Sequence, residues 1–520
     1  MRKLLSALLL GSVAAAPSQR APDPTPTFNV GTKLVEVDVV ARNKNGPATG
    51  LTREDFTVFD NGVPQDIAFF TARSARTSAT TQPASIVSPL PPGVVSNRAN
   101  PKGEAPATQT VLLLDRFFTN PINQGFAINR IAKFLDLRRK QDGIGIYTLT
   151  NSLRVIQEVT DNDTLLRRAA KSLKAGNPVN LGHSDTTGMS EHAAAEYLNP
   201  NFPIIMFKHT LQSIARHLAN VPGRKNLIWI SEAFPIFYCM PHLPCVDYTP
   251  DMQEAARALN DANVALYAVD PRGLEGALGR MTGISNAEGR GPASQSVPGY
   301  RVAPVGPTHI ETMNFLAGLT GGSVYFNDNG IEDLIKTVVE DGDVTYSLSF
   351  YPSQAAQDGK VHPLKVNVAR AGVNLRYRKN YFATKPQSPG DIPTLQQLLG
   401  DPLDATQISL QAQATRDPAR AGFFNVRIAV DLHGVQLANQ DGKWIGSLEV
   451  SLHIENSSSS QVLPYTIEIP ADQLATALEQ GVVIDHSIEW PSKSGDLRIV
   501  VEDKTSGAAG SLRIPLGKNQ

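Results

Sequence analysis

The sequence predicts an α/β protein whose centre is a doubly wound, mostly parallel six-stranded sheet with all-β modules on either side. Three observations favour this class. Six short apolar segments alternate with helical patterns in the middle of the chain, as in parallel sheets covered by helices. The second and third segments are joined by too few residues for a crossover, so this pair should be antiparallel. Strand patterns without helices precede and follow the alternating region.

The chain begins with a pattern typical of a secretory signal peptide. Two basic residues precede an apolar run of about ten residues, and three alanines then offer a cleavage site, so residues 1–16 are interpreted as the signal. A membrane anchor is the alternative, but the run is shorter than the ~18 residues that span a bilayer. We therefore expect a secreted or periplasmic protein with no transmembrane segment after the signal.

A small β module should follow the signal. Residues 17–27 are rich in proline and alanine and are expected to be disordered. Residues 28–72 contain β-branched and aromatic runs, and the Asn-Gly pair at 61–62 between apolar alternations predicts a hairpin. Residues 73–107 are rich in Ser, Thr, Pro and Ala, which is typical of a linker.

The alternating region covers residues 108–345. The expected strands are residues 111–114, 144–149, 153–159, 226–230, 264–269 and 324–326. The expected helices are residues 126–137, a segment capped by Thr160 or Asp161 and ending at 173, and residues 207–218, 251–262, 313–319 and 331–339. No G-x-G-x-x-G follows the first strand, and the antiparallel pair departs from a dinucleotide-binding arrangement. Nucleotide binding is therefore not expected.

Helical patterns stop after the alternating region. Residues 346–384 are expected to form a β extension, residues 385–405 a second linker, and residues 406–520 a C-terminal β-sandwich. The formal net charge of −1 gives no electrostatic reason to expect nucleic acid or an anionic membrane as a partner. Cys239 and Cys245 either pair, as an oxidising compartment allows, or remain two thiols. Zinc is not expected there, because His242 is the only further ligand nearby and structural zinc sites use four.

Five phrases resemble the von Willebrand factor A-related proteins of Acidobacteria. They are VEVDVVARNKNGPATGLTREDFTVFDNG at 35–62, PGRKNLIWISEAFP at 222–235, ANVALYAVDPRGL at 262–274, LAGLTGGSVYF at 316–326 and LRYRKNYFA at 375–383. The resemblance spans residues 28–383 and implies a von Willebrand factor A-like central domain. It also implies a domain that binds protein ligands, often through a metal-ion-dependent adhesion site. Within these phrases, Arg224 and Lys225 either belong to the motif's function or are a polar entry to a strand.

The resemblance implies where such a metal site would lie. In the family, an Asp-x-Ser-x-Ser loop follows the first strand, and its hard oxygens suit Mg²⁺ or Ca²⁺ at the carboxyl edge of the sheet. Asp115 holds the first position, and Thr119 stands at the second serine. Phe117 stands at the first serine and has no oxygen to offer. Glu232 follows the fourth strand, where the family has an aspartate.

Further ligand-binding residues are expected in two loops at the same edge. The threonine loop should lie between residues 176 and 188, where Ser184, Asp185, Thr186 and Thr187 are candidates and Thr186 is preferred. Asp270 ends the fifth strand and precedes a long Gly-, Ser- and Pro-rich stretch at 273–307, which is either a recognition loop or disordered. A turn or helix-capping role is the alternative for Asp270.

Two interpretations of the metal residues remain open. Asp115, Thr119 and Glu232 could form a non-standard Mg²⁺ or Ca²⁺ site. Alternatively, Asp115 and Glu232 are polar strand-end residues that bind loop amides and helix N-termini, and the neighbouring Arg116 would disfavour a cation.

The leading hypothesis is an exported, non-enzymatic protein-binding or adhesion-type module with an extracytoplasmic protein partner. The second is a structural component of the envelope or extracellular matrix that self-associates. The third is a hydrolase with an unrecognised site, although the sequence contains no G-x-S-x-G, H-E-x-x-H or P-loop motif.

Overall fold

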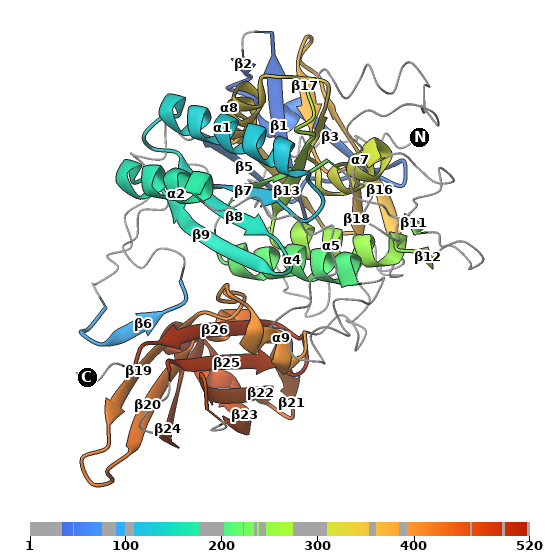
Figure 1. Cartoon of the computed structure of the whole chain (residues 1–520). Coiled ribbons are helices and arrows are strands. Elements are labelled where there is room, and N and C mark those ends of the chain that lie inside the picture. The colour runs from blue at the N-terminus through green and yellow to red at the C-terminus, as the bar shows by residue number, and fades with distance from the viewer. Residues whose placement is uncertain are drawn as a thin grey trace, which may run out of the picture.

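The computed structural model describes three packed units (Figure 1). The described residues are 34–44, 46–74, 90–98, 109–175, 202–221, 223–232, 237–238, 246–273, 309–352, 360–383, 393–457, 460–490 and 495–516. The expected signal at 1–16, the segment at 17–27, Cys239, Cys245, Thr186 and most of the stretch at 273–307 lie outside these residues. Among the described residues, no helix has both the length and the apolar character needed to cross a membrane.

The central unit is a six-stranded sheet in the order β14-β13-β10-β7-β8-β9. Its strands are β7 (Gln109–Asp115), β8 (Gly143–Leu149), β9 (Leu153–Thr160), β10 (Lys225–Ile230), β13 (Val264–Val269) and β14 (Val324–Tyr325). All neighbours pair in parallel except β8 and β9, which are antiparallel as the short connection predicts. Numbered along the chain, the strands lie in the order 3-2-1-4-5-6, which is that of a doubly wound fold.

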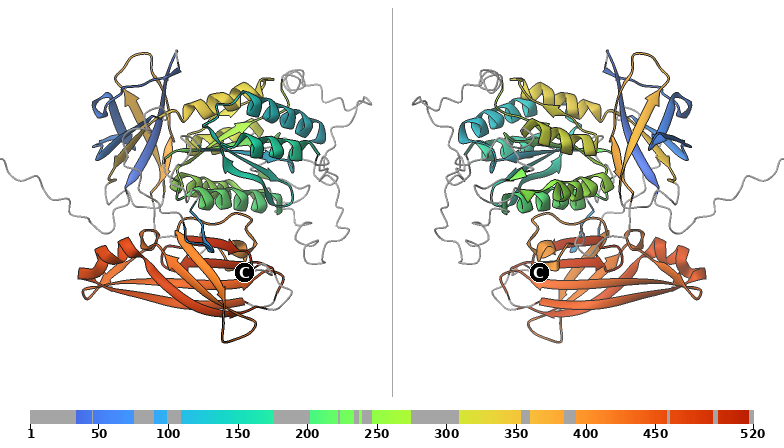
Figure 2. Two further views of the ribbon diagram at one scale, coloured as in Figure 1. Left: turned by 90° about the vertical axis from the view of Figure 1, so that its left-hand side faces the viewer. Right: turned by 90° about the vertical axis from the view of Figure 1, so that its right-hand side faces the viewer.

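Helices cover both faces of this sheet (Figures 1 and 2). One face carries α4 (Phe202–Leu218), α5 (Thr249–Asp261) and α7 (His309–Thr320), and the other carries α1 (Pro121–Leu137), α2 (Asp163–Ala175) and α8 (Ile331–Asp341). Because both faces are covered, β7, β8, β10 and β13 are buried along their whole lengths. The expected cap of α2 at Thr160 or Asp161 is wrong by one or two residues, because the side chain of Asn162 accepts the N–H groups of Thr164 and Leu165.

A first β-sandwich lies beside the central unit. It is formed by the segments that precede and follow the central unit in the sequence. One sheet has the order β17-β1-β15-β5 and the other β18-β16-β3-β4. The strands are β1 (Val35–Asn43), β2 (Gly46–Pro47), β3 (Phe56–Asp60), β4 (Val63–Gln65), β5 (Phe69–Ser74), β15 (Val344–Phe350), β16 (Val361–Val368), β17 (Asn374–Arg376) and β18 (Asn380–Phe382), with a 3-10 turn at Arg53–Asp55. Residues 28–72 and 346–384 were expected to form separate modules, but β15 lies between β1 and β5, so they share one sheet. The central unit is thus inserted into this sandwich.

The predicted hairpin of this sandwich is present. β3 and β4 pair antiparallel around Asn61 and Gly62, whose φ angles are 49° and 81°. Positive φ at both central residues is what a type I′ turn requires, and Asn-Gly is the sequence that adopts it most readily.

A second β-sandwich at the C-terminus packs under α4 (Figure 1). Its sheets have the orders β24-β20-β19-β6 and β21-β22-β25-β26, and β23 pairs with β22. Its elements are α9 (Leu395–Gly400), β19 (Leu410–Arg416), β20 (Phe423–Val430), β21 (Ala438–Gln440), β22 (Lys443–Ile454), β23 (Ser460–Pro470), α10 (Leu474–Gln480), β24 (Val482–Glu489), β25 (Leu497–Asp503) and β26 (Ala509–Ile514), with 3-10 turns at Leu432–Gly434 and Ala471–Gln473. A short pair, β11 (Phe237–Tyr238) and β12 (Val246–Asp247), precedes α5.

Two segments that the sequence analysis expected to be linkers contain ordered elements. β6 (Val94–Ser96) lies within residues 73–107 and pairs with β19 of the C-terminal sandwich. α9 lies within residues 385–405, and Thr394 and Gln397 form a capping box at its start. Compositional bias predicted linkers here because a three-residue strand and a six-residue helix are too short to change the average composition of these segments.

Candidate functional site

The candidate site lies at the carboxyl ends of β7 and β10. These are the first and fourth strands along the chain, and the strand order reverses between them. Doubly wound sheets bind ligands in the crevice at this switch point. Asp115 ends β7, Ser231 and Glu232 follow β10, and Asp270 follows the neighbouring β13.

The side chain of Asp115 is completely buried and bound on both oxygens. Oδ1 accepts the backbone N–H groups of Phe117 and Phe118, each at 3.0 Å. Oδ2 accepts the indole Nε1–H of Trp229 and the hydroxyl of Ser231, again at 3.0 Å each. A carboxylate offers about four lone-pair positions, and four protein donors occupy them here.

Burial has the largest effect on the pKa of the Asp115 carboxyl. Removal from water raises the pKa of its carboxyl from 3.8 to about 6, although all four hydrogen bonds favour the ionised form. The group is therefore ionised at neutral pH and is held in place by donors that were positioned for its charge.

Aromatic packing and the side chain of a glutamine hold the loop after Asp115 in its conformation. Phe117 and Phe118 pack edge to face at 5.0 Å and contact the core beneath α4. Gln124 accepts the Nε–H of Arg116 and donates its amide to the carbonyls of Arg116 and Thr119. The hydroxyl of Thr119 is buried and has no hydrogen-bond partner. Sequence reasoning missed Gln124, whose only signal was a polar residue on the inward face of the first turn of α1.

Glu232 and Asp270 each accept hydrogen bonds from nearby residues of the central unit. Glu232 Oε1 accepts the backbone N–H of Asn120 at 2.9 Å and the side-chain amide of Asn123 at 2.6 Å, at the N-terminus of α1. A carboxylate is favoured at this end of a helix dipole. Asp270 accepts the Nε–H and terminal N–H groups of Arg272. That arginine also feels the charge of Glu232.

These residues do not fit a divalent cation site. Phe117 supplies no oxygen, and the indole N–H of Trp229 occupies the side of Asp115 that faces β10. Glu232 is bound to α1, and a guanidinium lies nearby. Within the described residues, no three His, Cys, Asp or Glu side chains are grouped to hold a metal. The unpartnered hydroxyl of Thr119 is the one feature in favour of such a site.

One strongly exposed apolar side chain lies at this edge. Ile122, in the first turn of α1, is 84% exposed, while the adjacent Asn123 binds Glu232. Arg272 is partly exposed beside them. One exposed aliphatic side chain with an acidic and a basic neighbour is a surface that can contact another protein.

Two residues of the phrases that carry the family resemblance, Arg224 and Lys225, lie at the opposite end of the sheet, where β10 begins. Arg224 donates to the carbonyl of Gly321 at 2.7 Å, and Lys225 donates to the carbonyl of Val221 at 2.7 Å. Burial lowers the pKa of Lys225 to about 8, against the opposing effect of Asp38 in the first sandwich. Both residues therefore lie where the two units meet.

Acidic side chains complete this interface. Asp38 of β1 accepts the amide of Asn263 at 2.6 Å. Asp341, at the end of α8, is fully buried and binds Arg42 of β1 and Arg376 of β17, each at 2.5 Å. At Gly321, φ is +77° and a Cβ would lie 2.4 Å from the backbone of Arg378, so only glycine fits this contact.

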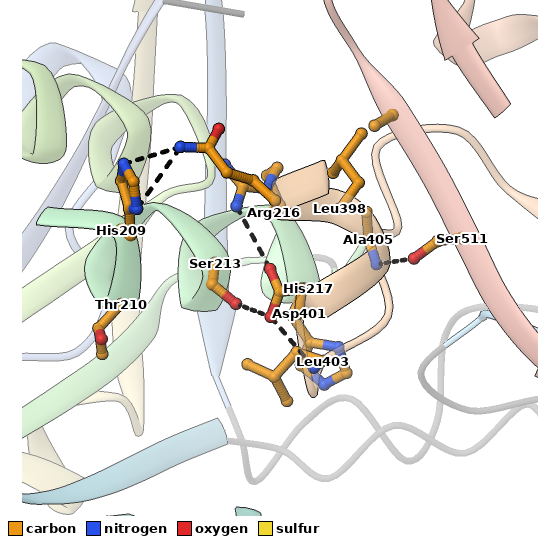
Figure 3. A network of polar contacts seen from close by, with 12 residues as sticks. His209, Thr210, Ser213, Arg216, His217, Leu398, Asp401, Leu403, Ala405 and Ser511 are labelled. Atoms are coloured by element: carbon orange, nitrogen blue, oxygen red, sulfur yellow. Dashed lines mark hydrogen bonds and ion pairs between the residues drawn. The ribbon is translucent and has the colours of Figure 1, made fainter. Parts of the chain in front are cut away.

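The C-terminal sandwich is bound to α4 by a polar network (Figure 3). The hydroxyl of Ser213 and the guanidinium of Arg216 both donate to Asp401, and His217 contacts the carbonyl of Asp404 at 2.8 Å and Glu158 at 3.2 Å. These contacts join α4 to the residues that follow α9.

No protein-family model and no curated protein matches the sequence, so the resemblance to the acidobacterial family stays a prediction. Solved structures do match. An aerotolerance-related membrane protein from Bacteroides fragilis is 13% identical, with a TM-score of 0.26, over 45% of this chain and 98% of its own. A von Willebrand factor type A protein from Catenulispora acidiphila is 9% identical, with a TM-score of 0.25, over 94% and 74%. A mussel byssus matrix protein with a zinc-occupied adhesion motif is 10% identical, with a TM-score of 0.22, over 45% and 47%.

Proposed function

We propose that the protein is an exported, non-enzymatic binding module that recognises an extracytoplasmic protein at the carboxyl edge of its central sheet without a divalent cation. One observation carries the proposal. At the switch point the acidic side chains are bound by protein donors, while the aliphatic side chain of Ile122 stands exposed beside them. The export part of the proposal is supported by the pattern of residues 1–16.

Partner contact at this edge would follow the usual anatomy of an interface. Ile122 would enter an apolar pocket on the partner, and Glu232 and Arg272 would lie at the polar rim. Asp270 would contribute by holding Arg272 in position, and Thr186, which lies outside the described residues, stays a candidate contact from the sequence alone.

A cation-dependent form of the same function is less favourable. Mg²⁺ or Ca²⁺ at Asp115, Thr119 and Glu232 would require Asp115 to release Trp229 or Ser231. Leaving a buried donor such as this indole N–H unpaired costs about 1–3 kcal/mol. Glu232 would also have to leave the N-terminus of α1.

Photo-crosslinking tests the proposal. A benzoylphenylalanine at Ile122 should crosslink one polypeptide from envelope or secreted fractions of the source organism, equally with Mg²⁺ and with EDTA. The matched control carries the same residue at Val63, which is 58% exposed on the first sandwich. Equal crosslinking at both positions would argue against the proposal, and loss with EDTA would argue against its cation-independent form.

Self-association as a structural component is the second candidate. The edge strands of the C-terminal sandwich carry exposed apolar side chains, namely Val462 and Tyr465 on β23 and Val483 on β24. Exposed apolar residues on edge strands favour contacts between copies. Size-exclusion chromatography with light scattering decides this case, because a monomer at all concentrations would contradict it.

A further inference from the structure

The C-terminal sandwich takes one of its strands from a distant part of the chain. β6 pairs antiparallel with β19, with Ser96 opposite Gln411 and Val94 opposite Gln413. The hydroxyl of Ser96 donates to the carbonyl of Leu410, 314 residues away. β19 pairs with β20 on its other side, so β6 extends the sheet at its edge.

The residue after β6 fixes this strand in place. Asn97 is only 5% exposed, and its amide donates to the carbonyls of Ala405 at 2.8 Å and Ile408 at 2.9 Å. Its Oδ1 accepts the backbone N–H of Leu410 at 2.7 Å. A buried amide is tolerated only when it is hydrogen-bonded. The pocket between Ala405 and Leu410 is therefore matched in position and polarity to an asparagine.

Contacts at both ends of the segment set its register. The N–H of Val94 donates to the carbonyl of Pro91, and φ at Gly93 is +79°, so a turn ends the pairing after three residues. Gln413 donates to the carbonyl of Pro92, and Arg98 forms an ion pair with Asp431 at 2.9 Å. All these recognition elements lie within residues 91–98.

The acceptor segment also touches the central unit. The N–H of Thr406 donates to the carbonyl of Arg216 at 3.1 Å, and the hydroxyl of Thr406 accepts the N–H of Asn220. The stretch between Ala405 and Leu410 therefore binds α4 on one side and Asn97 on the other. Any side chain bound between Ala405 and Leu410 therefore contacts the segment that joins the C-terminal sandwich to the central unit.

We propose that the β19 edge and the Ala405–Leu410 pocket form a strand-acceptor site for an extended peptide of the pattern Val-Val-Ser-Asn. In a single chain, residues 94–97 occupy this site. When they leave it, the same segment of a second copy takes their place. Strand addition gives affinity through main-chain bonds, and one side-chain pocket gives selectivity, which here is for asparagine. Exchange of an identical element between copies needs no new contacts.

A peptide-binding experiment on the full chain tests the site. The probe is a fluorescent peptide of residues 90–98, titrated against the wild type and against an Asn97→Ala chain. The Asn97→Ala chain should bind the peptide at least about tenfold more tightly than the wild type, whose own segment competes at high effective concentration. A matched peptide carrying Asn97→Ala should not bind either chain.

A second variant keeps the test decisive if the Asn97→Ala chain does not fold. Val95→Pro interrupts the ladder of β6 and removes a side chain that packs on the sandwich core, but β19 and the stretch between Ala405 and Leu410 keep their sequence, so this chain should also bind the wild-type peptide. If either variant melts like the wild type and ignores the peptide, the acceptor site is refuted. Equal binding of the Asn97→Ala peptide would refute the asparagine pocket.

Disulfide trapping tests the exchange between copies. In a background with Cys239→Ser and Cys245→Ser, one copy carries Ser96→Cys and another carries Gln411→Cys, which are register partners. Mixing the copies should give a covalent dimer under mild oxidation. A control that pairs Ser96→Cys with Gln461→Cys should not. Absence of the dimer with the register partners would refute the exchange.

Discussion

The two ends of the central sheet use charged side chains in different ways. At the amino ends of the parallel strands, charged groups of the central unit bind charged groups of the first sandwich, as Asp341 binds Arg42 and Arg376. At the carboxyl ends, charged groups bind other residues of the central unit itself, as Asp115 binds Trp229 of β10 and Asp270 binds Arg272. One end is therefore an interface within the molecule, and the other end leaves an accessible surface.

The Arg-Lys and Gly-Gly pairs lie at one end of the sheet, and the proposed binding surface lies at the other. The Arg-Lys pair at 224–225 and the Gly-Gly pair at 321–322 belong to the phrases that resemble a family, and both lie at the interface with the sandwich. The accessible end is marked by the exposed Ile122, which belongs to none of those phrases. The Arg-Lys and Gly-Gly pairs thus help to join the central unit to the first sandwich.

The largest effect is expected at the interface end. Asp341→Ala leaves two arginines facing a buried gap, and breaking a buried ion pair costs about 3–5 kcal/mol of unfolding free energy. Chemical denaturation measures this loss. The control is Asp136→Ala, whose pair with Arg167 is about 60% exposed and should contribute less than about 1 kcal/mol. Equal losses in the two variants would contradict the buried role of Asp341.

Titration of Asp115 should give the next largest effect. Its pKa in the folded protein is about 6, above the ordinary 3.8, so folding favours the protonated form. Its contribution to stability is complete below about pH 4 and is lost as the pH rises through about 6, by up to about 3 kcal/mol. Asp115→Asn should lack this part of the pH profile measured by denaturation. An unchanged profile in the variant would show that Asp115 is not the titrating group.

Coupling between Asp115 and Trp229 should be smaller but specific. A double-mutant cycle with Asp115→Ala and Trp229→Phe removes the packing contribution of the indole, which contacts Phe207. The remaining coupling in unfolding free energy should be about 1–2 kcal/mol, as for a buried hydrogen bond to a charged group. A coupling energy near zero would mean that the indole and the carboxylate do not interact.

The smallest effect is expected at Glu232. Glu232→Gln keeps an acceptor for Asn120 and Asn123 but removes the charge at the N-terminus of α1. The unfolding free energy should fall by about 0.3–1 kcal/mol, and high salt should reduce the difference. A loss that does not respond to salt would point to a packing role instead.

The sequence predicted most local elements and few distant pairings. Periodicity identified the alternating strands and helices, and the Asn-Gly pair identified the β3–β4 turn. It did not show that β1 pairs with β15, or that β6 pairs with β19. These partners are distant along the chain, and an alternating strand pattern carries no information on which edge it joins.

The strand-end positions of the candidate residues could be predicted, but their contacts could not. Asp115 and Glu232 could be assigned to strand ends from the pattern alone. That Trp229 turns its N–H toward Asp115, and that Gln124 closes the loop, depends on side-chain packing across three elements. Phe117 in place of a serine, Glu232 in place of an aspartate and the neighbouring Arg116 were the sequence signals against a standard cation site.

Cation binding tests the central claim most directly. The melting temperature of the wild type should be the same, within about 1 °C, in EDTA and in millimolar Mg²⁺, Ca²⁺, Mn²⁺ or Zn²⁺, because a ligand that does not bind the folded state cannot stabilise it. Asp115→Ala should melt lower and be equally insensitive to these ions. A saturable rise in the melting temperature of the wild type that Asp115→Ala abolishes would contradict the account.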